Sequence, residues 1–129
     1  MATIFLNGEF VRREDARVSA FDAGFQHAVG LFETMLCVAG DQPRVLHLHE
    51  HLSRLADSAK QLRLTETLRV AALAEACERT LAHAVEESKA ARMRMRLTIT
   101  GGDLNLLDRA PGAAPMHPTL MIAAQPATE

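Results

Sequence analysis

Aromatic side chains are scarce in this chain of 129 residues. It contains five phenylalanines but no tryptophan and no tyrosine, and aromatic residues make up only 4% of the sequence. A small-molecule pocket in this chain therefore has no phenol or indole group to donate a hydrogen bond. We expect any such pocket to be built from phenylalanine, histidine, arginine and backbone groups.

Cysteine is equally sparse. The two thiols, Cys37 and Cys77, lie far apart in the sequence and show no CxxC spacing. This pattern disfavours a disulfide framework and a thiolate metal site. We expect two reduced and largely buried thiols.

The sequence also lacks a long apolar run and an excess of one charge sign. The N-terminal apolar run turns polar at Asn7, which makes it too short for a signal peptide or a membrane span. Charges of both signs are interspersed, with a formal net charge of -2 and a pI near 6.3, so neither nucleic acid nor a membrane is favoured as a partner. We therefore expect a cytoplasmic protein, whose 48% hydrophobic content suffices for one domain with one core.

Turn residues and apolar runs predict two pairs of strands in the first part of the chain. Asn7-Gly8 is the preferred pair for a type I′ turn, so we expect a hairpin between strands at 3–6 and 9–12. Residues 31–38 are rich in strand-forming side chains and are predicted to pair with a short strand at 44–46.

Two amphipathic helices are predicted next. Apolar residues recur at spacings of three and four over about 47–63 and again over about 68–85, the second helix having Thr67 as its expected N-cap. A strand at 92–100 follows, in which apolar residues alternate with arginine and threonine, so that one face should be core and the other polar. A loop over 103–118 should lead to a last strand at 119–124.

This order of elements predicts an α+β fold, a mainly antiparallel sheet with two helices packed on one face. We expect one domain over residues 1–124, followed by the start of an interdomain linker at 125–129.

Three segments carry a family resemblance. The motif E-H-x-x-R-L is present as Glu50-His51-Leu52-Ser53-Arg54-Leu55, and G-x-F-E-T as Gly30-Leu31-Phe32-Glu33-Thr34. The third motif, R-L-T-V-T-R-G, is present with its second arginine replaced, as Arg96-Leu97-Thr98-Ile99-Thr100-Gly101-Gly102. They resemble the N-terminal domain of class IV aminotransferases. That family depends on pyridoxal 5′-phosphate (PLP) and includes branched-chain and D-amino-acid aminotransferases and aminodeoxychorismate lyase.

The resemblance implies that Arg54 binds the phosphate of the cofactor. A guanidinium suits this role because it can form two parallel hydrogen bonds to a phosphate and keeps its charge at any working pH. Without the resemblance, an arginine on an amphipathic helix would be interpreted as a solvated residue. His51, in the same motif, is expected to be a packing residue near the start of the helix.

The resemblance further implies that Phe32, His27 and Arg96 face the substrate. From the sequence alone, Phe32 could equally be a core residue, and Arg96 could belong to a solvated face with its neighbouring arginines. The sequence departs from the subgroups of the family: Leu36 stands where branched-chain enzymes tend to have arginine, and Gly101 where D-amino-acid enzymes carry one. These departures argue against both subgroups.

The lysine that forms a Schiff base with PLP is not expected in this chain. Lys60 and Lys89 are its only lysines, and both lie at predicted helix ends where they should face solvent. The leading hypothesis is therefore the N-terminal domain of a PLP-dependent class IV aminotransferase or aminodeoxychorismate-lyase-like enzyme, without a catalytic residue and inactive alone. Its expected partners are a C-terminal PLP-binding domain, an amino acid or keto acid substrate, and a second subunit in a homodimer.

Two alternatives remain open at this stage. The first is a non-catalytic, stand-alone module derived from the family that dimerises or binds a ligand. The second is a metal-dependent enzyme that uses His47, His49 and His51, because imidazole is a common metal ligand. A helix beginning near Leu48 would point His49 away from the other two rings, so we predict no metal site.

Overall fold

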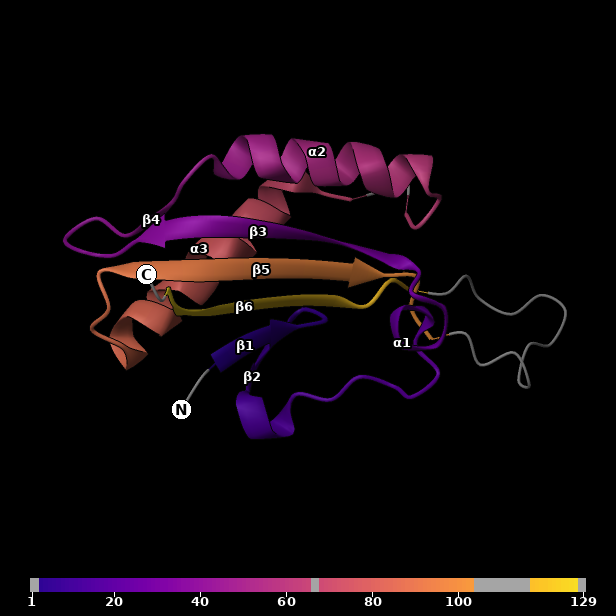
Figure 1. Ribbon diagram of the computed structural model, residues 1–129, viewed down its shortest axis with the longest axis horizontal. Coiled ribbons are helices and arrows are strands. Elements are labelled where there is room, and N and C mark those ends of the chain that lie inside the picture. The colour runs from indigo at the N-terminus through magenta and orange to yellow at the C-terminus, as the bar shows by residue number, and fades with distance from the viewer. Residues whose placement is uncertain (1–2, 66–67, 104–116, 128–129) are drawn as a thin grey trace, which may run out of the picture.

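A six-stranded antiparallel sheet forms the body of the chain in the computed structural model, which describes residues 3–65, 68–103 and 117–127 (Figure 1). Its strand order is β2-β1-β6-β5-β3-β4. The strands are β1 (Thr3–Leu6), β2 (Glu9–Arg12), β3 (Gly30–Val38), β4 (Arg44–Val45), β5 (Arg92–Thr100) and β6 (Leu120–Pro126). The predicted α+β class is confirmed, and every predicted strand is present.

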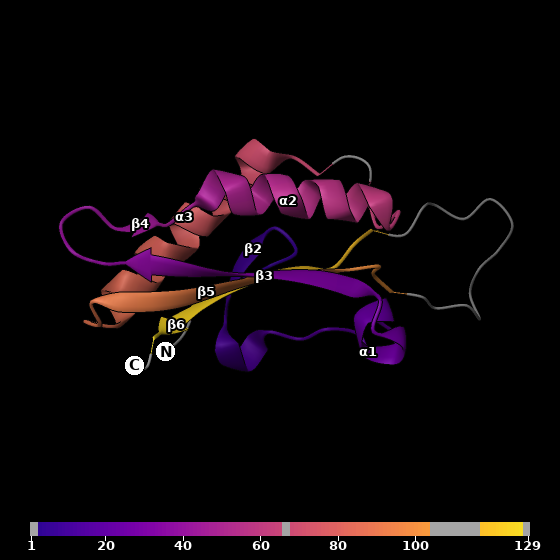
Figure 2. The same ribbon diagram turned by 45° about the horizontal axis from the view of Figure 1, so that its top comes forward.

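Two long helices, α2 (Leu48–Gln61) and α3 (Val70–Glu87), lie on one side of the sheet (Figure 2). Both were predicted from their periodicity. The second begins later than expected, with Arg69 as its N-cap, and the predicted cap Thr67 lies outside the described residues.

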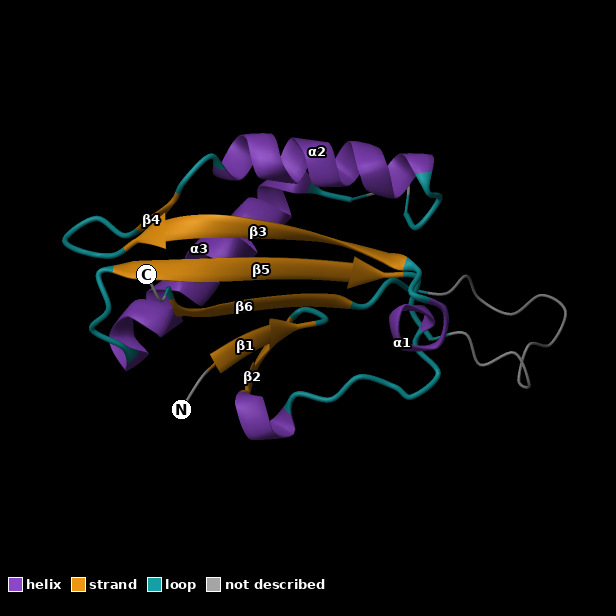
Figure 3. Ribbon diagram, viewed as in Figure 1, coloured by secondary structure: helices purple, strands orange, loops and turns teal. Residues whose placement is uncertain are grey.

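Two short helical segments were not predicted. A 3-10 helix, η1 (Arg13–Asp15), and α1 (Ala23–His27) lie on the other side of the sheet from α2 and α3 (Figures 2 and 3). Neither is long enough to show a hydrophobic period, which is why the sequence pattern missed them.

The first hairpin has the turn that its sequence predicts. Asn7 and Gly8 both have positive φ, 50° and 92°, as a type I′ turn requires. The turn is also tied to the last strand, because the amide of Leu120 donates to Oδ1 of Asn7 at 2.8 Å and the amide of Asn7 donates to the carbonyl of Leu120 at 2.9 Å. The turn therefore reinforces the pairing of β1 with β6, the first and last strands in chain order.

The core lies between the sheet and the two long helices. Alternate residues of the three central strands point toward α2 and α3 and are buried: Met35, Cys37, Met93, Met95, Leu97, Ile99 and Ile122. The helices meet them with buried residues that include Leu52, Leu55, Leu73, Cys77 and Leu81. Both thiols are free and buried, as predicted, and burial raises the pKa of Cys37 to about 11 and that of Cys77 to about 12.

The opposite face of the sheet is uncovered along β3 and β5, and we call it the open face. It is formed by the intervening residues of these strands, among them Phe32, Thr34, Leu36, Arg92, Arg94 and Arg96, which are all exposed. The register pairs Phe32 with Thr98 and Thr34 with Arg96. The predicted division of β5 into a core face and a polar face is confirmed.

The last strand runs further than predicted. Gln125 and Pro126, which we expected in a linker, pair with Arg94 and Met93 of β5. The domain boundary itself stays a prediction, and the predicted loop over 103–118 lies mostly outside the described residues. Within the described part of the chain, no helix combines the length and apolar character that crossing a bilayer needs.

Candidate functional site

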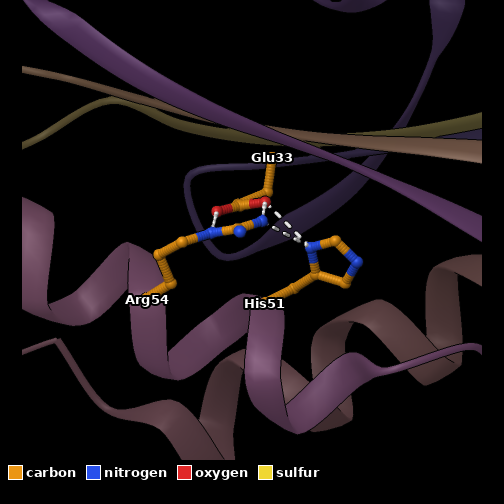
Figure 4. Close-up of polar contacts among 3 residues, drawn as sticks. All are labelled: Glu33, His51 and Arg54. Atoms are coloured by element: carbon orange, nitrogen blue, oxygen red, sulfur yellow. Dashed lines mark hydrogen bonds and ion pairs between the residues drawn. The ribbon is translucent and has the colours of Figure 1, made fainter.

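Glu33, His51 and Arg54 form a polar cluster between the sheet and α2 (Figure 4). Nε and Nη2 of Arg54 donate to the two carboxylate oxygens of Glu33, each at 2.8 Å. Nδ1 of His51 lies 2.8 Å from Oε2 of the same carboxylate and 3.2 Å from Nη2 of Arg54. One carboxylate thus holds two side chains of the following helix.

The local sequence explains how these residues meet. Alternation along β3 places Glu33 on the core side of the strand together with Met35 and Cys37. His51 and Arg54 are three residues apart on α2 and therefore share one face of the helix. Glu33 is buried, with 10% of its side chain exposed, whereas 66% of the Arg54 side chain is exposed.

The cluster is charged at neutral pH. The hydrogen bonds from Arg54 lower the pKa of Glu33 and outweigh its burial, which acts in the opposite direction, and the hydrogen bond with His51 lowers it further. The same contact raises the pKa of Arg54. An ionised carboxylate can only accept, so the short contact assigns a proton to Nδ1 of His51, which donates to Glu33.

Arg54 retains a donor for a ligand. Its contacts with the described residues use Nε and Nη2, and Nη1 takes part in none of the hydrogen bonds among them. An exposed guanidinium that is held along one edge and free at the other suits an anionic oxygen such as that of a phosphate. The residue that the sequence singled out for the phosphate of PLP therefore fits that group.

The open face carries a cavity of about 760 Å³ beside Phe32 and Arg96. Phe25 and residues 18–20 also line it, as do Thr98 and Thr100 of β5. The guanidinium of Arg96 lies over the ring of Phe32 at 4.0 Å, a cation–π contact. Phe32 is 58% exposed, so its interpretation as a core residue is wrong. Its role toward a substrate stays a prediction.

His27 is placed differently from the other predicted site residues. It ends α1, its side chain is exposed, and it is not among the residues that line the cavity. Its role toward a substrate also stays a prediction.

The predicted site residues lie on two faces of the sheet. Phe32 and Glu33 are neighbours in β3, so their side chains point in opposite directions, Phe32 into the cavity and Glu33 toward Arg54. The two faces meet along the outer edge of β3, which pairs with β4 only at Cys37 and Val38. A ligand that touched both Arg54 and Phe32 would have to lie across this edge.

Sequence reasoning missed the roles of three polar residues that shape the site. Glu33 was seen only as part of a motif, although a carboxylate on the core side of an alternating strand signals a cationic partner elsewhere. His51 was expected to pack, but it donates to Glu33. Asp22 is 1% exposed and accepts hydrogen bonds from Gly24, Thr100 and Thr119, which ties α1 to the ends of two strands.

The three histidines at alternate positions do not gather around a point. His47 is the N-cap of α2, His49 is exposed, and His51 binds Glu33. Among the residues that the structure describes, no three histidine, cysteine, aspartate or glutamate side chains are grouped as metal ligands.

Comparison with known proteins identifies the family of this chain. The family model for amino-transferase class IV matches residues 30–129. The chain belongs to the class IV aminotransferases. It is 37% identical over 124 residues to a putative branched-chain-amino-acid aminotransferase of Methanocaldococcus jannaschii, a match that covers 91% of this chain and 41% of the relative.

Solved structures share the fold of this chain. The branched-chain amino acid aminotransferase of Escherichia coli superposes with a TM-score of 0.79 and 30% identity, over 98% of this chain and 40% of that one. A hypothetical aminotransferase from Mycobacterium tuberculosis in a PLP-bound form, at 24% identity and a TM-score of 0.78, again covers 98% of this chain and 40% of its own, and it shows the same fold.

The chain thus corresponds to the N-terminal domain of class IV aminotransferases and spans about two fifths of the length of the relatives it matches. The family is one of PLP enzymes that act on amino acids. The relatives described above include branched-chain enzymes, although Leu36 led us to expect a distance from that subgroup.

Proposed function

We propose that this chain supplies one side of a PLP site in a class IV aminotransferase or a related lyase. The observation that carries the proposal is the state of Arg54: its guanidinium is largely exposed, is fixed along one edge by Glu33, and has an Nη1 that makes no hydrogen bond to the described residues. It occupies the arginine position of the E-H-x-x-R-L motif, in a chain that belongs to the family.

In this proposal Arg54 binds the phosphate of PLP, and Phe32 and Arg96 form a wall of the substrate pocket, with His27 nearby. Bound PLP supplies an electron sink for the carbon that exchanges its amino group. Arg96 offers a carboxylate of the amino acid or keto acid two donors in one plane. The lysine that binds the cofactor comes from the C-terminal domain, so the chain alone has no catalytic residue.

Exposed aromatic residues near the cavity favour contact with another domain or subunit there. Phe21 and Phe25 are 54% and 78% exposed, and Phe25 lines the cavity. Large exposed apolar side chains are typical of surfaces that another domain or subunit covers. They support the C-terminal domain and the second subunit of a homodimer as partners. A cytoplasmic location stays part of the proposal.

The same exposed residues also suit the alternative of a stand-alone dimerisation or ligand-binding module. The two functions differ in PLP binding, because the module needs no cofactor. Arg54 favours the PLP enzyme, since a dimerisation surface requires no exposed guanidinium fixed for an anion.

The experiment is to produce this chain together with the C-terminal domain of a class IV relative and to isolate the pair. We expect the pair to retain PLP through gel filtration and to transfer an amino group from an amino acid to a keto acid. A folded, stable pair that retains no PLP would contradict the proposal and favour the stand-alone module.

A further inference from the structure

We propose that Glu33 is a positioning residue for the cofactor phosphate: its carboxylate fixes the guanidinium of Arg54 in the orientation that presents Nη1 to the phosphate. The inference rests on the proposed function of Arg54 and adds a second residue to that site.

The geometry shows a side chain held at two points. Both oxygens of Glu33 accept from Arg54 at 2.8 Å, which fixes the plane of the guanidinium as well as its place. An exposed arginine without such a partner samples many rotamers, and binding a ligand then has to order it. Glu33 removes this ordering cost before the phosphate arrives.

Glu33 is itself fixed. It is buried in a strand of the sheet, and His51 donates to Oε2 in addition to Arg54. With three hydrogen bonds on two oxygens, the carboxylate is bound from α2 at positions 51 and 54. The position of the guanidinium is therefore set by the rigid sheet and not by the helix alone.

A competing electrostatic effect gives the proposal a sharp test. The negative charge of Glu33 lies beside Arg54 and by Coulomb's law opposes a second anion there. If charge dominated, Glu33→Gln would tighten phosphate binding. If positioning dominates, as we propose, the same substitution weakens it, because the amide supplies only one acceptor and places a donor against the donors of Arg54.

The measurement is the Kd for PLP of the chain paired with the C-terminal domain of a class IV relative. We expect Glu33→Gln to weaken binding by about tenfold. This is the lower end of the loss in affinity at metal sites when a residue that orients a ligand side chain is removed. Glu75→Gln, the same change at an exposed position of α3, should leave the Kd unchanged. An unchanged or tighter Kd for Glu33→Gln would overturn the inference.

A double substitution separates positioning from a general folding defect. Because Glu33 acts through Arg54, adding Glu33→Gln to Arg54→Ala should weaken PLP binding no further. A further loss in the double variant would contradict the inference while leaving the proposed function intact. If Arg54→Ala alone has no effect on the Kd, the proposed function fails, and the inference fails with it.

A second measurement needs no variant and so survives a Glu33→Gln chain that does not fold. In the nuclear magnetic resonance spectrum of the unaltered chain, the Nε–H proton of Arg54 should exchange with water more slowly than those of Arg92 and Arg94, for which the structure shows no carboxylate partner among the described residues. Exchange at the same rate in all three would contradict a fixed guanidinium.

Discussion

A buried carboxylate is the most constrained side chain of the site. Glu33 occupies a core-facing position of β3 that would suit an apolar residue, next to Met35 and Cys37. Its charge is stable there because Arg54 and His51 bind it, and removing either partner would leave a charge poorly compensated. The contacts with Arg54 and His51 therefore account for a charged residue at a position that would suit an apolar one.

The pKa of Glu33 predicts how its contribution to stability depends on pH. Because the folded chain lowers this pKa below its ordinary value of 4.5, the unfolded chain binds more protons as pH falls past that value. The cluster's contribution is therefore present at neutral pH and is lost as pH falls from about 4.5 through the lower pKa of the folded chain.

We expect Glu33→Gln to lower the free energy of unfolding at pH 7 by about 1–2 kcal/mol, a modest value because Arg54 is largely exposed. Urea unfolding measured from pH 7 to about pH 3 should show the gap between the two chains closing at the acid end. Glu75→Gln serves as the control, and a gap that widens toward acid would contradict the assignment of the charges.

The two thiols should be unreactive in the folded chain. Burial raises the pKa of Cys37 to about 11 and that of Cys77 to about 12, so the thiolate that reacts with a disulfide reagent is rare at pH 8. A thiol reagent at pH 8 should modify both residues only after denaturant is added. Rapid modification of either residue in the folded chain would show that the core opens there.

Residue patterns in the sequence predicted which side chains are buried better than they predicted which polar side chains contact each other. Alternation in β5 identified Met93, Met95 and Leu97 as core, because burial on one face of a strand follows from its period of two. Arg54, the partner of Glu33, lies 21 residues further along the chain on another element. A local sequence pattern cannot predict a contact between residues so far apart. Arg54 was found only through the family motif, and its contact with Glu33 only through the structure.

Asp22 joins three elements at the end of the sheet nearest the cavity. Its carboxylate caps α1 through the amide of Gly24 at 2.8 Å and accepts from the hydroxyls of Thr100 at 2.9 Å and Thr119 at 2.6 Å. These contacts hold the segment that carries Phe25 and residues 18–20, which line the cavity. Asp22 therefore supports the pocket without lying in the Arg54 cluster.

We expect Asp22→Ala to lower the free energy of unfolding by about 2–4 kcal/mol, since three donors lose a buried acceptor. Asp57→Ala, an exposed aspartate of α2, is the control and should change the stability little. Urea unfolding measures both. A loss no larger than that of the control would show that water replaces the carboxylate.

The elements themselves were predictable to different degrees. Long periodic segments, α2, α3 and β5, were predicted because many residues repeat one spacing. The five residues of α1 contain too little repetition, and the helix depends on the cap from Asp22 and on contacts with distant strands. The end of β6 was misjudged because Gln125 and Pro126 have loop composition but still pair with β5.

The whole molecule places its two candidate surfaces on opposite faces of one sheet. Arg54 lies on the helix side, and the cavity with Phe32 and Arg96 lies on the open face. The outer edge of β3 separates them and is largely unpaired. The sequence motifs named Arg54, Phe32 and Arg96 but could not show that they lie on opposite faces, because that depends on how β3 and α2 pack together.

Whether Arg54 binds the cofactor phosphate is tested most directly by the Kd for PLP of the chain paired with the C-terminal domain of a class IV relative, compared between the unaltered chain and Arg54→Ala. Loss of one charged contact to the phosphate should weaken binding roughly 10- to 100-fold. Lys60→Ala, which removes an exposed cation from the same helix, should leave the Kd unchanged. Equal Kd values for the unaltered chain and Arg54→Ala would show that Arg54 does not bind the phosphate.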